Sequence, residues 1–107
     1  MIKQTLDEWR NEAMERFGEK TSQWKFTCPR CQNSQSPQDF VDAGIAQQEA
    51  ANMSYQQCIG RKVTGKGCDW VAYGLLGTLG QGRVVVAPDG REVEVFNFAE
   101  QQKNSPR

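Results

Sequence analysis

The chain contains no histidine. Histidine is the commonest general base and a usual ligand of catalytic zinc, so its absence excludes His-based triads and the familiar catalytic zinc sets. No apolar run approaches the roughly 18 residues that cross a bilayer. The N-terminal segment is charged throughout and lacks the apolar stretch of a secretory signal. We therefore expect a cytoplasmic protein that has no membrane partner.

Net charge is also absent, because 13 Lys and Arg residues balance 13 Asp and Glu residues among the 107. Nucleic-acid binders that work by bulk charge are usually strongly basic, so this balance argues against that class. Leu, Ile, Val and Phe are scarce, at 20 of 107 residues, and this fraction of about 19% touches the range of disordered chains. Disorder usually needs high net charge as well. We therefore expect one folded domain whose small aliphatic core needs additional stabilisation, such as a bound metal or a disulfide.

Four cysteines are the strongest chemical signal. Cys28 and Cys31 enclose two residues, a spacing that lets both thiolates point inward from one tight turn and supply half of a tetrahedral zinc site. Thiols stay reduced in the cytoplasm, so four cysteines there are more typical of a metal site than of disulfide bonds. Four sulfur ligands leave no open position for water, so the expected site is structural. The sequence predicts one zinc ion per chain, bound by Cys28, Cys31, Cys58 and Cys68.

The second half of this site has an unusual spacing, with nine residues between Cys58 and Cys68. We predict a β-hairpin over residues 58–73, centred near Val63, that places the two cysteines on opposed strands about 5 Å apart. Gly67 would let the backbone approach closely, and Trp70 would shield the ion. The same pair could instead form a cross-strand disulfide or act as two small buried residues. A redox role for CPRC needs a helix after the motif, whereas a polar loop follows Cys31.

An N-terminal helix is predicted over residues 6–17, because Thr5 and Glu8 form a capping box and Gly18 is placed to end it. One apolar face of this helix should be buried and consists of Leu6, Trp9, Ala13 and Phe17. A second stripe is acidic and is either a solvated face or a docking surface for a basic partner protein. This acidic stripe consists of Glu8, Glu12, Glu15 and Glu19.

The rest of the pattern completes an α+β fold class. We expect a strand at 24–27, a short helix at 37–43, a helix within 46–57 that ends a residue or two before Cys58, and a C-terminal β-hairpin formed by 84–86 and 92–96. The helix must stop early because the negative end of its dipole would oppose a thiolate. The predicted domain is a single zinc-binding unit over residues 1–98, followed by a disordered tail at 99–107.

The segments WKFTCPRC, QQCIGR and GCDWVAYGL carry a resemblance that covers residues 5–76. Locally they resemble zinc-ribbon modules of nucleic-acid machinery, including bacterial topoisomerase tails. The whole arrangement is similar to short proteins encoded by phages and prophages. The resemblance implies a central zinc-ribbon-like or treble-clef-like unit with the four cysteines as metal ligands. Because such phage proteins often regulate or inhibit host proteins, including as anti-defence factors, it also implies a bacterial host protein as partner.

These observations favour a non-enzymatic, zinc-stabilised interaction module with no small-molecule substrate. Asp39, Asp42 and Asp69 are present, but no pattern pairs them for acid–base work. The alternative is a nucleic-acid-binding accessory protein. Its candidate nucleic-acid contacts lie near the cysteines in the sequence and are Arg30, Arg61, Lys62, Lys66 and Trp70. The four basic residues could equally be loop charges that only keep the protein soluble.

Overall fold

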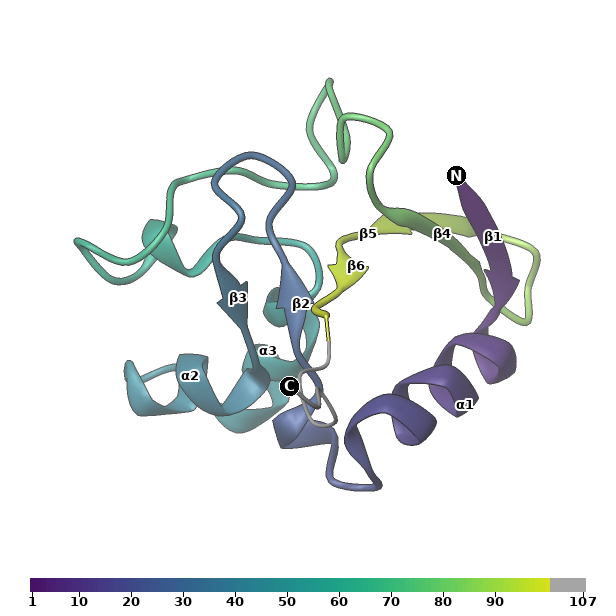
Figure 1. The fold of residues 1–107 in the computed structure, drawn as a ribbon, viewed down its shortest axis with the longest axis horizontal. Helices are drawn as coiled ribbons and strands as arrows, with labels where there is room; N and C mark the ends of the chain where they lie inside the picture. Colours follow the sequence, from purple (N-terminus) through teal and green to yellow (C-terminus); the bar gives the residue numbers. More distant parts are fainter. Residues whose placement is uncertain (101–107) are drawn as a thin grey trace, which may run out of the picture.

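The computed structural model describes residues 1–100, and its helices and mixed sheets form an α+β fold (Figure 1). The α+β class predicted from the sequence is therefore confirmed. The elements in chain order are β1 (Ile2–Thr5), α1 (Leu6–Phe17), the 3-10 helix η1 (Thr21–Gln23), β2 (Phe26–Thr27), β3 (Ser34–Gln35), α2 (Pro37–Asp42), α3 (Gln47–Ser54), the 3-10 helix η2 (Ile59–Arg61), β4 (Arg83–Val86), β5 (Glu92–Val95) and β6 (Asn97–Phe98).

Helix α1 forms over the predicted residues. The capping box is present: Glu8 N–H donates to Thr5 Oγ1 at 3.2 Å, and Thr5 N–H donates to Glu8 Oε1 at 2.9 Å. These bonds satisfy donors that a helix start otherwise leaves unpaired. Trp9 and Ala13 are buried, while Leu6 and Phe17 are partly buried against the same core. The predicted apolar face of the helix is therefore confirmed.

The C-terminal hairpin is present but belongs to a larger sheet. Strands β4 and β5 pair antiparallel, and Ala87 N–H donates to Arg91 O across the turn. Strand β1 adds to the other side of β4 in parallel orientation, with Ile2 opposite Arg83. Sequence reasoning missed β1, because parallel strands need not be close in the chain and local alternation therefore gives no sign of the partner.

A second sheet has the order β3-β2-β6, and it joins the strands that flank Cys28 and Cys31 to β6 at Asn97–Phe98. Phe26 in β2 lies opposite Phe98 in β6. Ala99 is buried and its N–H donates to Lys25 O at 2.9 Å, so the packed chain extends one residue beyond the predicted domain end at 98. In the predicted tail, Glu100 is exposed, and residues 101–107 lie outside the described residues.

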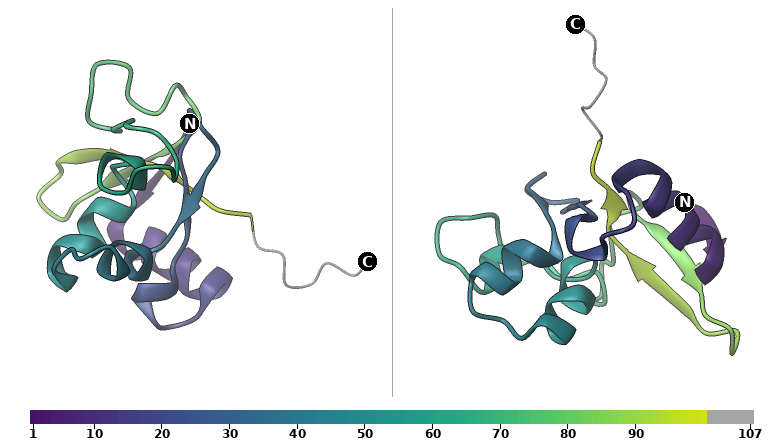
Figure 2. Two further views of the ribbon diagram at one scale, coloured as in Figure 1. Left: turned by 90° about the vertical axis from the view of Figure 1, so that its left-hand side faces the viewer. Right: turned by 90° about the horizontal axis from the view of Figure 1, so that it is seen from below.

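The core is built mainly from aromatic rings. The ring of Trp9 stacks near those of Phe26 and Phe98, with centroids 6.0 Å away in both cases, and Trp24 meets it edge-on at 6.2 Å. Aromatic side chains bury large areas, which offsets the scarcity of aliphatic residues. Helices α2 and α3 pack side by side at the end of the molecule away from α1 (Figure 2). They enclose a smaller cluster of Phe40, Ala50 and Ile59.

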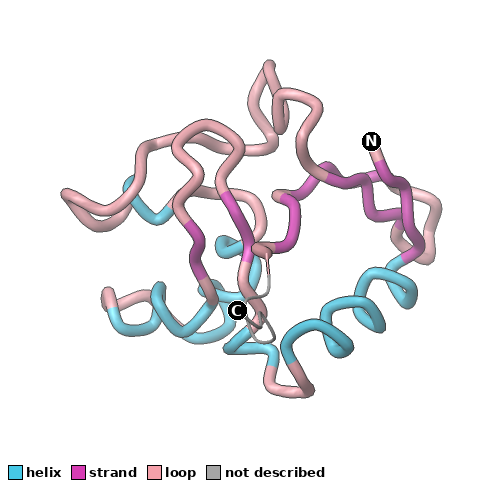
Figure 3. The backbone as a smooth tube through the Cα atoms, viewed as in Figure 1, coloured by secondary structure: helices cyan, strands magenta, loops and turns pink. Residues whose placement is uncertain are grey.

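The prediction of a β-hairpin over residues 58–73 is wrong. Apart from η2, this segment is loop and turn (Figure 3). Its only strand-like pairing is an isolated bridge from Gln57 to Val71, beside which Cys58 N–H donates to Trp70 O at 2.9 Å. Cys58 therefore faces Trp70 rather than Cys68 along the backbone. The chain departs from strand geometry after Cys58, which is extended and is the N-cap of η2, whose first residue Ile59 is buried.

Among residues 1–100, the structure has no helix with the length and hydrophobicity needed to span a bilayer.

Candidate metal centre

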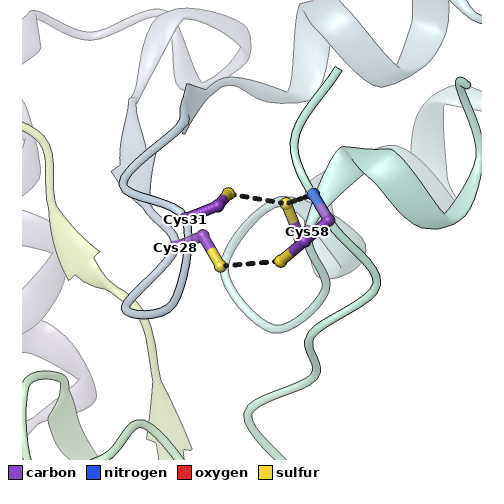
Figure 4. A group of neighbouring side chains, drawn as sticks. Cys28, Cys31 and Cys58 are labelled. Atoms are coloured by element: carbon purple, nitrogen blue, oxygen red, sulfur yellow. Dashed lines mark hydrogen bonds between the residues drawn. The ribbon is translucent and has the colours of Figure 1, made fainter. Parts of the chain in front are cut away.

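Cys28 and Cys31 lie on the turn that connects β2 to β3, with their sulfurs directed toward the segment that carries Cys58 (Figure 4). The turn is held at its base by Cys28 N–H, which donates to Asn33 O at 3.0 Å. It is closed by Gln32 N–H, which donates to Cys28 O at 3.0 Å. The short β2–β3 hairpin thus presents both thiols from one side, as the two-residue spacing predicts.

Cys58 is positioned by a buried glutamine. The side-chain amide of Gln35 is completely buried and donates to Ser54 O at 2.9 Å and to Gln57 O at 2.6 Å. Its carbonyl accepts a 2.8 Å bond from Ile59 N–H. Gln35 therefore ties β3 to the end of α3 and to the start of η2, where Cys58 sits. Sequence analysis missed this role because Gln35 lies in a run of polar residues that resembles an exposed loop.

Two glycines allow the Cys58 and Cys68 segments to meet. A Cβ atom at Gly67, where φ is 78°, would lie 2.6 Å from Cys58 Sγ. A Cβ atom at Gly60 would lie 2.3 Å from the backbone oxygen of Cys68. Such distances are far inside van der Waals contact, so only glycine fits at either position. The predicted close approach at Gly67 is confirmed, whereas Gly60 was not singled out from the sequence.

The four sulfur atoms all lie within 4.8 Å of one another. Cys28 Sγ is 3.6 Å from Cys68 Sγ, and Cys31 Sγ is 3.7 Å from Cys58 Sγ. Sulfurs bound tetrahedrally at about 2.3 Å from one zinc ion would be about 3.8 Å apart. The predicted ligands are therefore brought together in a group that could hold a metal ion.

Backbone N–H groups surround the sulfurs. Cys68 N–H donates to Cys58 Sγ at 3.1 Å, Gly60 N–H also points at this sulfur, and the N–H groups of Arg30 and Cys31 point at Cys28 Sγ. Hydrogen bonds to a sulfur favour its charged form. The turn and loop therefore supply fixed dipoles that partly compensate the charge of bound thiolates.

The pKa values of the cysteine thiols depend on how far each is buried and on the hydrogen bonds that it receives. Burial raises the pKa of Cys28 and of Cys58. Burial acts in the same direction on Cys31, but hydrogen bonds from Asn33 N–H and from the neighbouring thiols outweigh it and lower the pKa of Cys31. Cys28 and Cys58 are buried, Cys68 is half-buried and Cys31 is exposed. The cluster therefore has one open side, at Cys31.

A family model matches residues 5–99. The chain belongs to the VVA0879-like family. The match begins at the N-cap of α1 and ends at the buried Ala99, so it includes all four cysteines. No curated protein and no solved structure matches the chain.

The basic residues near the cysteine cluster of the VVA0879-like chain differ in their contacts. Arg30 is 3.4 Å from the Asp69 carboxylate and lies 5.9 Å from the centroid of the Trp70 ring. Arg61 donates to the backbone oxygen of Asp69 at 3.0 Å. Lys62 and Lys66 are exposed on the loop beyond η2. Trp70 is half-buried and packs against the main core, with its Nε1–H donating to Gly77 O at 2.8 Å.

The acidic residues on α1 and just after it also divide into two kinds. Glu15 and Glu19 are exposed, and Glu8 is exposed while serving in the capping box. Glu12 lies apart from these, because its carboxylate accepts bonds from Arg83 at 2.6 Å and from Arg16 at 2.8 Å. The acidic surface available to a partner is therefore formed by Glu8 and Glu15 on α1 and by Glu19 just beyond the end of the helix.

Proposed function

We propose that this VVA0879-like chain is a non-enzymatic interaction module stabilised by one structural zinc ion. The observation that supports the proposal best is the mutual approach of the four sulfurs to within 4.8 Å. They come from two segments, one in the β2–β3 turn and one between α3 and β4. A metal bound here would tie both segments to one point, and its binding energy would contribute to folding.

The donor set favours zinc. Four thiolates in tetrahedral arrangement suit zinc or iron and do not suit magnesium or calcium, which prefer oxygen. The cysteines are free thiols in the structure, and the contacts Cys28–Cys68 and Cys31–Cys58 each join the first half of the site to the second. One shared ion accounts for such an arrangement better than two independent pairs do. Four protein ligands also close the coordination sphere, which supports a structural rather than a catalytic role.

Elemental analysis of protein purified without chelator tests the metal. We expect one zinc per chain and a colourless solution. If the protein instead contains one iron per chain and shows the absorption of iron–thiolate bonds, the structural metal is iron and not zinc. Protein that contains no metal and does not take up added zinc would contradict the structural-zinc proposal.

The proposed partner is a bacterial protein, bound in the manner of a phage-derived regulator or inhibitor. The exposed carboxylates Glu8 and Glu15 lie on α1, whose other face is buried, and the exposed Glu19 follows just after the helix ends at Phe17. A focused negative surface accelerates encounter with a basic partner and makes the association rate fall with salt. We therefore infer that α1 meets a positively charged surface.

A pull-down from bacterial lysate, with and without nuclease, tests this partner class. Capture should survive nuclease and should weaken for the variant Glu15→Lys plus Glu19→Lys. The matched control is Asp42→Lys plus Glu49→Lys, which reverses two exposed charges on α2 and α3. Equal capture by both variants would show that α1 is merely a solvated face.

The alternative, a nucleic-acid accessory, is supported by exposed Lys62 and Lys66 beside the metal centre. It is weakened by the engagement of Arg30 and Arg61 with Asp69 and of Arg30 with the Trp70 ring. If the alternative holds, the wild-type protein shifts an oligonucleotide at low salt. Changing Lys62 and Lys66 to Glu would then abolish the shift.

A further inference from the structure

The loop between Trp70 and β4 exposes large apolar side chains. Leu75 is 101% exposed, Leu76 63% and Leu79 44%, and Tyr73 is exposed beside them. Met1 is also exposed and adjoins the loop, because its Sδ is 3.5 Å from Thr78 Oγ1. We call this set, Met1, Tyr73, Leu75, Leu76 and Leu79, the apolar loop surface. Figure 1 shows the loop projecting from the rest of the fold next to the start of β4.

The base of the loop is held in place. Thr78 is completely buried, and its backbone N–H donates to the Glu94 carboxylate at 2.8 Å. Gly82 N–H donates to Thr78 Oγ1 at 3.0 Å, and Trp70 Nε1–H binds Gly77 O. The leucine side chains therefore point outward from an anchored turn. A presented apolar patch of this kind is typical of an interaction site.

None of the five side chains of this surface is charged. Residues 70–82 contain no Lys, Arg, Asp or Glu. In a two-fold symmetric pair the same patch meets itself, so a patch whose charges all have one sign would face like charges. The acidic surface formed by Glu8, Glu15 and Glu19 would repel its own copy, and so would the loop with Lys62 and Lys66. The apolar loop surface can meet itself without this repulsion.

We propose that the apolar loop surface is the contact between two copies of this chain, which form a symmetric dimer. A stable interface buries about 800 Å² per partner. Five large side chains exposed between 44% and 101% supply on the order of half of that area, and their neighbours supply the rim. The occupant is therefore a second copy, and the driving force is apolar burial. This inference does not depend on the identity of the metal.

Sedimentation equilibrium of the tag-free, metal-loaded full chain tests the dimer. We expect a mass of twice the 12.1 kDa chain at high concentration and a dissociation constant that does not rise with salt. The variant Leu75→Ser plus Leu76→Ser should raise that constant about tenfold or more. Both side chains are exposed in the single chain, so zinc content and the unfolding of dilute protein should stay unchanged.

Met14→Ser is the matched control, because Met14 is an exposed apolar residue on α1, away from the loop. It should leave dimerisation unchanged. A wild-type chain that stays monomeric at its highest soluble concentration would overturn the proposal. A dimer that tolerates the double leucine variant, or that Met14→Ser disrupts equally, would also overturn it. Zinc measured on every sample separates failure of the dimer from failure of the metal site.

Discussion

Arg83 and Glu12 form an ion pair between β4 and α1, with Arg83 Nη1 2.6 Å from Glu12 Oε1 and the arginine side chain only 5% exposed. The same guanidinium donates to Asn97 Oδ1 at 2.8 Å and to Gln4 Oε1 at 3.0 Å, and it lies 4.8 Å from the centre of the Phe98 ring. One buried arginine thus connects β1, α1, β4 and β6. These are the elements that hold the N- and C-terminal parts of the described chain together.

Removing the charge of Glu12 should destabilise the fold. In Glu12→Gln, Arg83 stays buried without its carboxylate, and breaking such a pair from one side is strongly unfavourable. We expect the free energy of unfolding to fall by about 2–3 kcal/mol, measured by urea denaturation. Glu15→Gln, one turn nearby and exposed, is the control and should change it by less than about 0.5 kcal/mol. Equal effects of the two substitutions would contradict the role of the pair.

The same pair should give the fold a pH dependence. Burial acts to raise the pKa of Glu12, but hydrogen bonds from Arg83, Arg16 and Gln4 outweigh it, so the pKa lies below its ordinary value of 4.5. The stabilisation is complete above pH 4.5 and is lost as the pH falls through the depressed folded-state pKa, because the unfolded chain binds the proton first. The stability difference between wild type and Glu12→Gln should therefore shrink from pH 6 to pH 3. Measuring both proteins cancels the effect of acid on the metal site.

The helix, the β4–β5 hairpin and the cysteine grouping could be predicted because local patterns specify them. The capping box of Thr5 and Glu8 and the spacing of Cys28 and Cys31 are short-range signals. The Arg83–Glu12 pair joins residues 71 positions apart, and the β1–β4 pairing is similarly remote, so no local pattern marks either. The prediction of a hairpin at 58–73 was wrong because alternation and glycines are local signals for strands and a turn. They give no sign that Ile59 is buried and that its N–H donates to the distant Gln35 side chain.

Loss of one cysteine should release the metal and weaken the fold. We expect Cys68→Ser to bind less than one zinc per chain and to unfold at a clearly lower temperature, because three sulfurs hold the ion poorly and its binding energy contributes to folding. Thermal unfolding with and without a chelator, combined with elemental analysis, checks this. Ser34→Ala, an exposed substitution in β3, is the control and should keep its zinc. A Cys68→Ser protein that melts like the wild type would show that the metal contributes little.

Gly60→Ala should disrupt the metal centre without touching a ligand. Its Cβ would lie 2.3 Å from Cys68 O and 2.5 Å from Cys68 N, both backbone atoms that cannot turn aside. The Cys58 and Cys68 segments must then separate, which we expect to weaken zinc binding at least tenfold in a competition assay with a chelator. Gly74→Ala is the matched control, since its Cβ would meet a Val71 methyl group at 3.3 Å, and a side chain can adjust. Similar zinc affinities for the two variants would contradict the proposed close approach.

Gln35→Leu tests whether the buried amide positions the second half of the site. Leucine has a similar volume but leaves three backbone partners, Ser54 O, Gln57 O and Ile59 N–H, without their bonds. Each unsatisfied buried group costs about 1–3 kcal/mol, so the free energy of unfolding should fall by about 3 kcal/mol or more. Zinc affinity should fall as well, because Cys58 directly precedes Ile59. Gln38→Leu, an exposed position on α2, should change neither quantity appreciably. If Gln35→Leu kept wild-type zinc affinity while losing stability, Gln35 would support the fold but would not position Cys58.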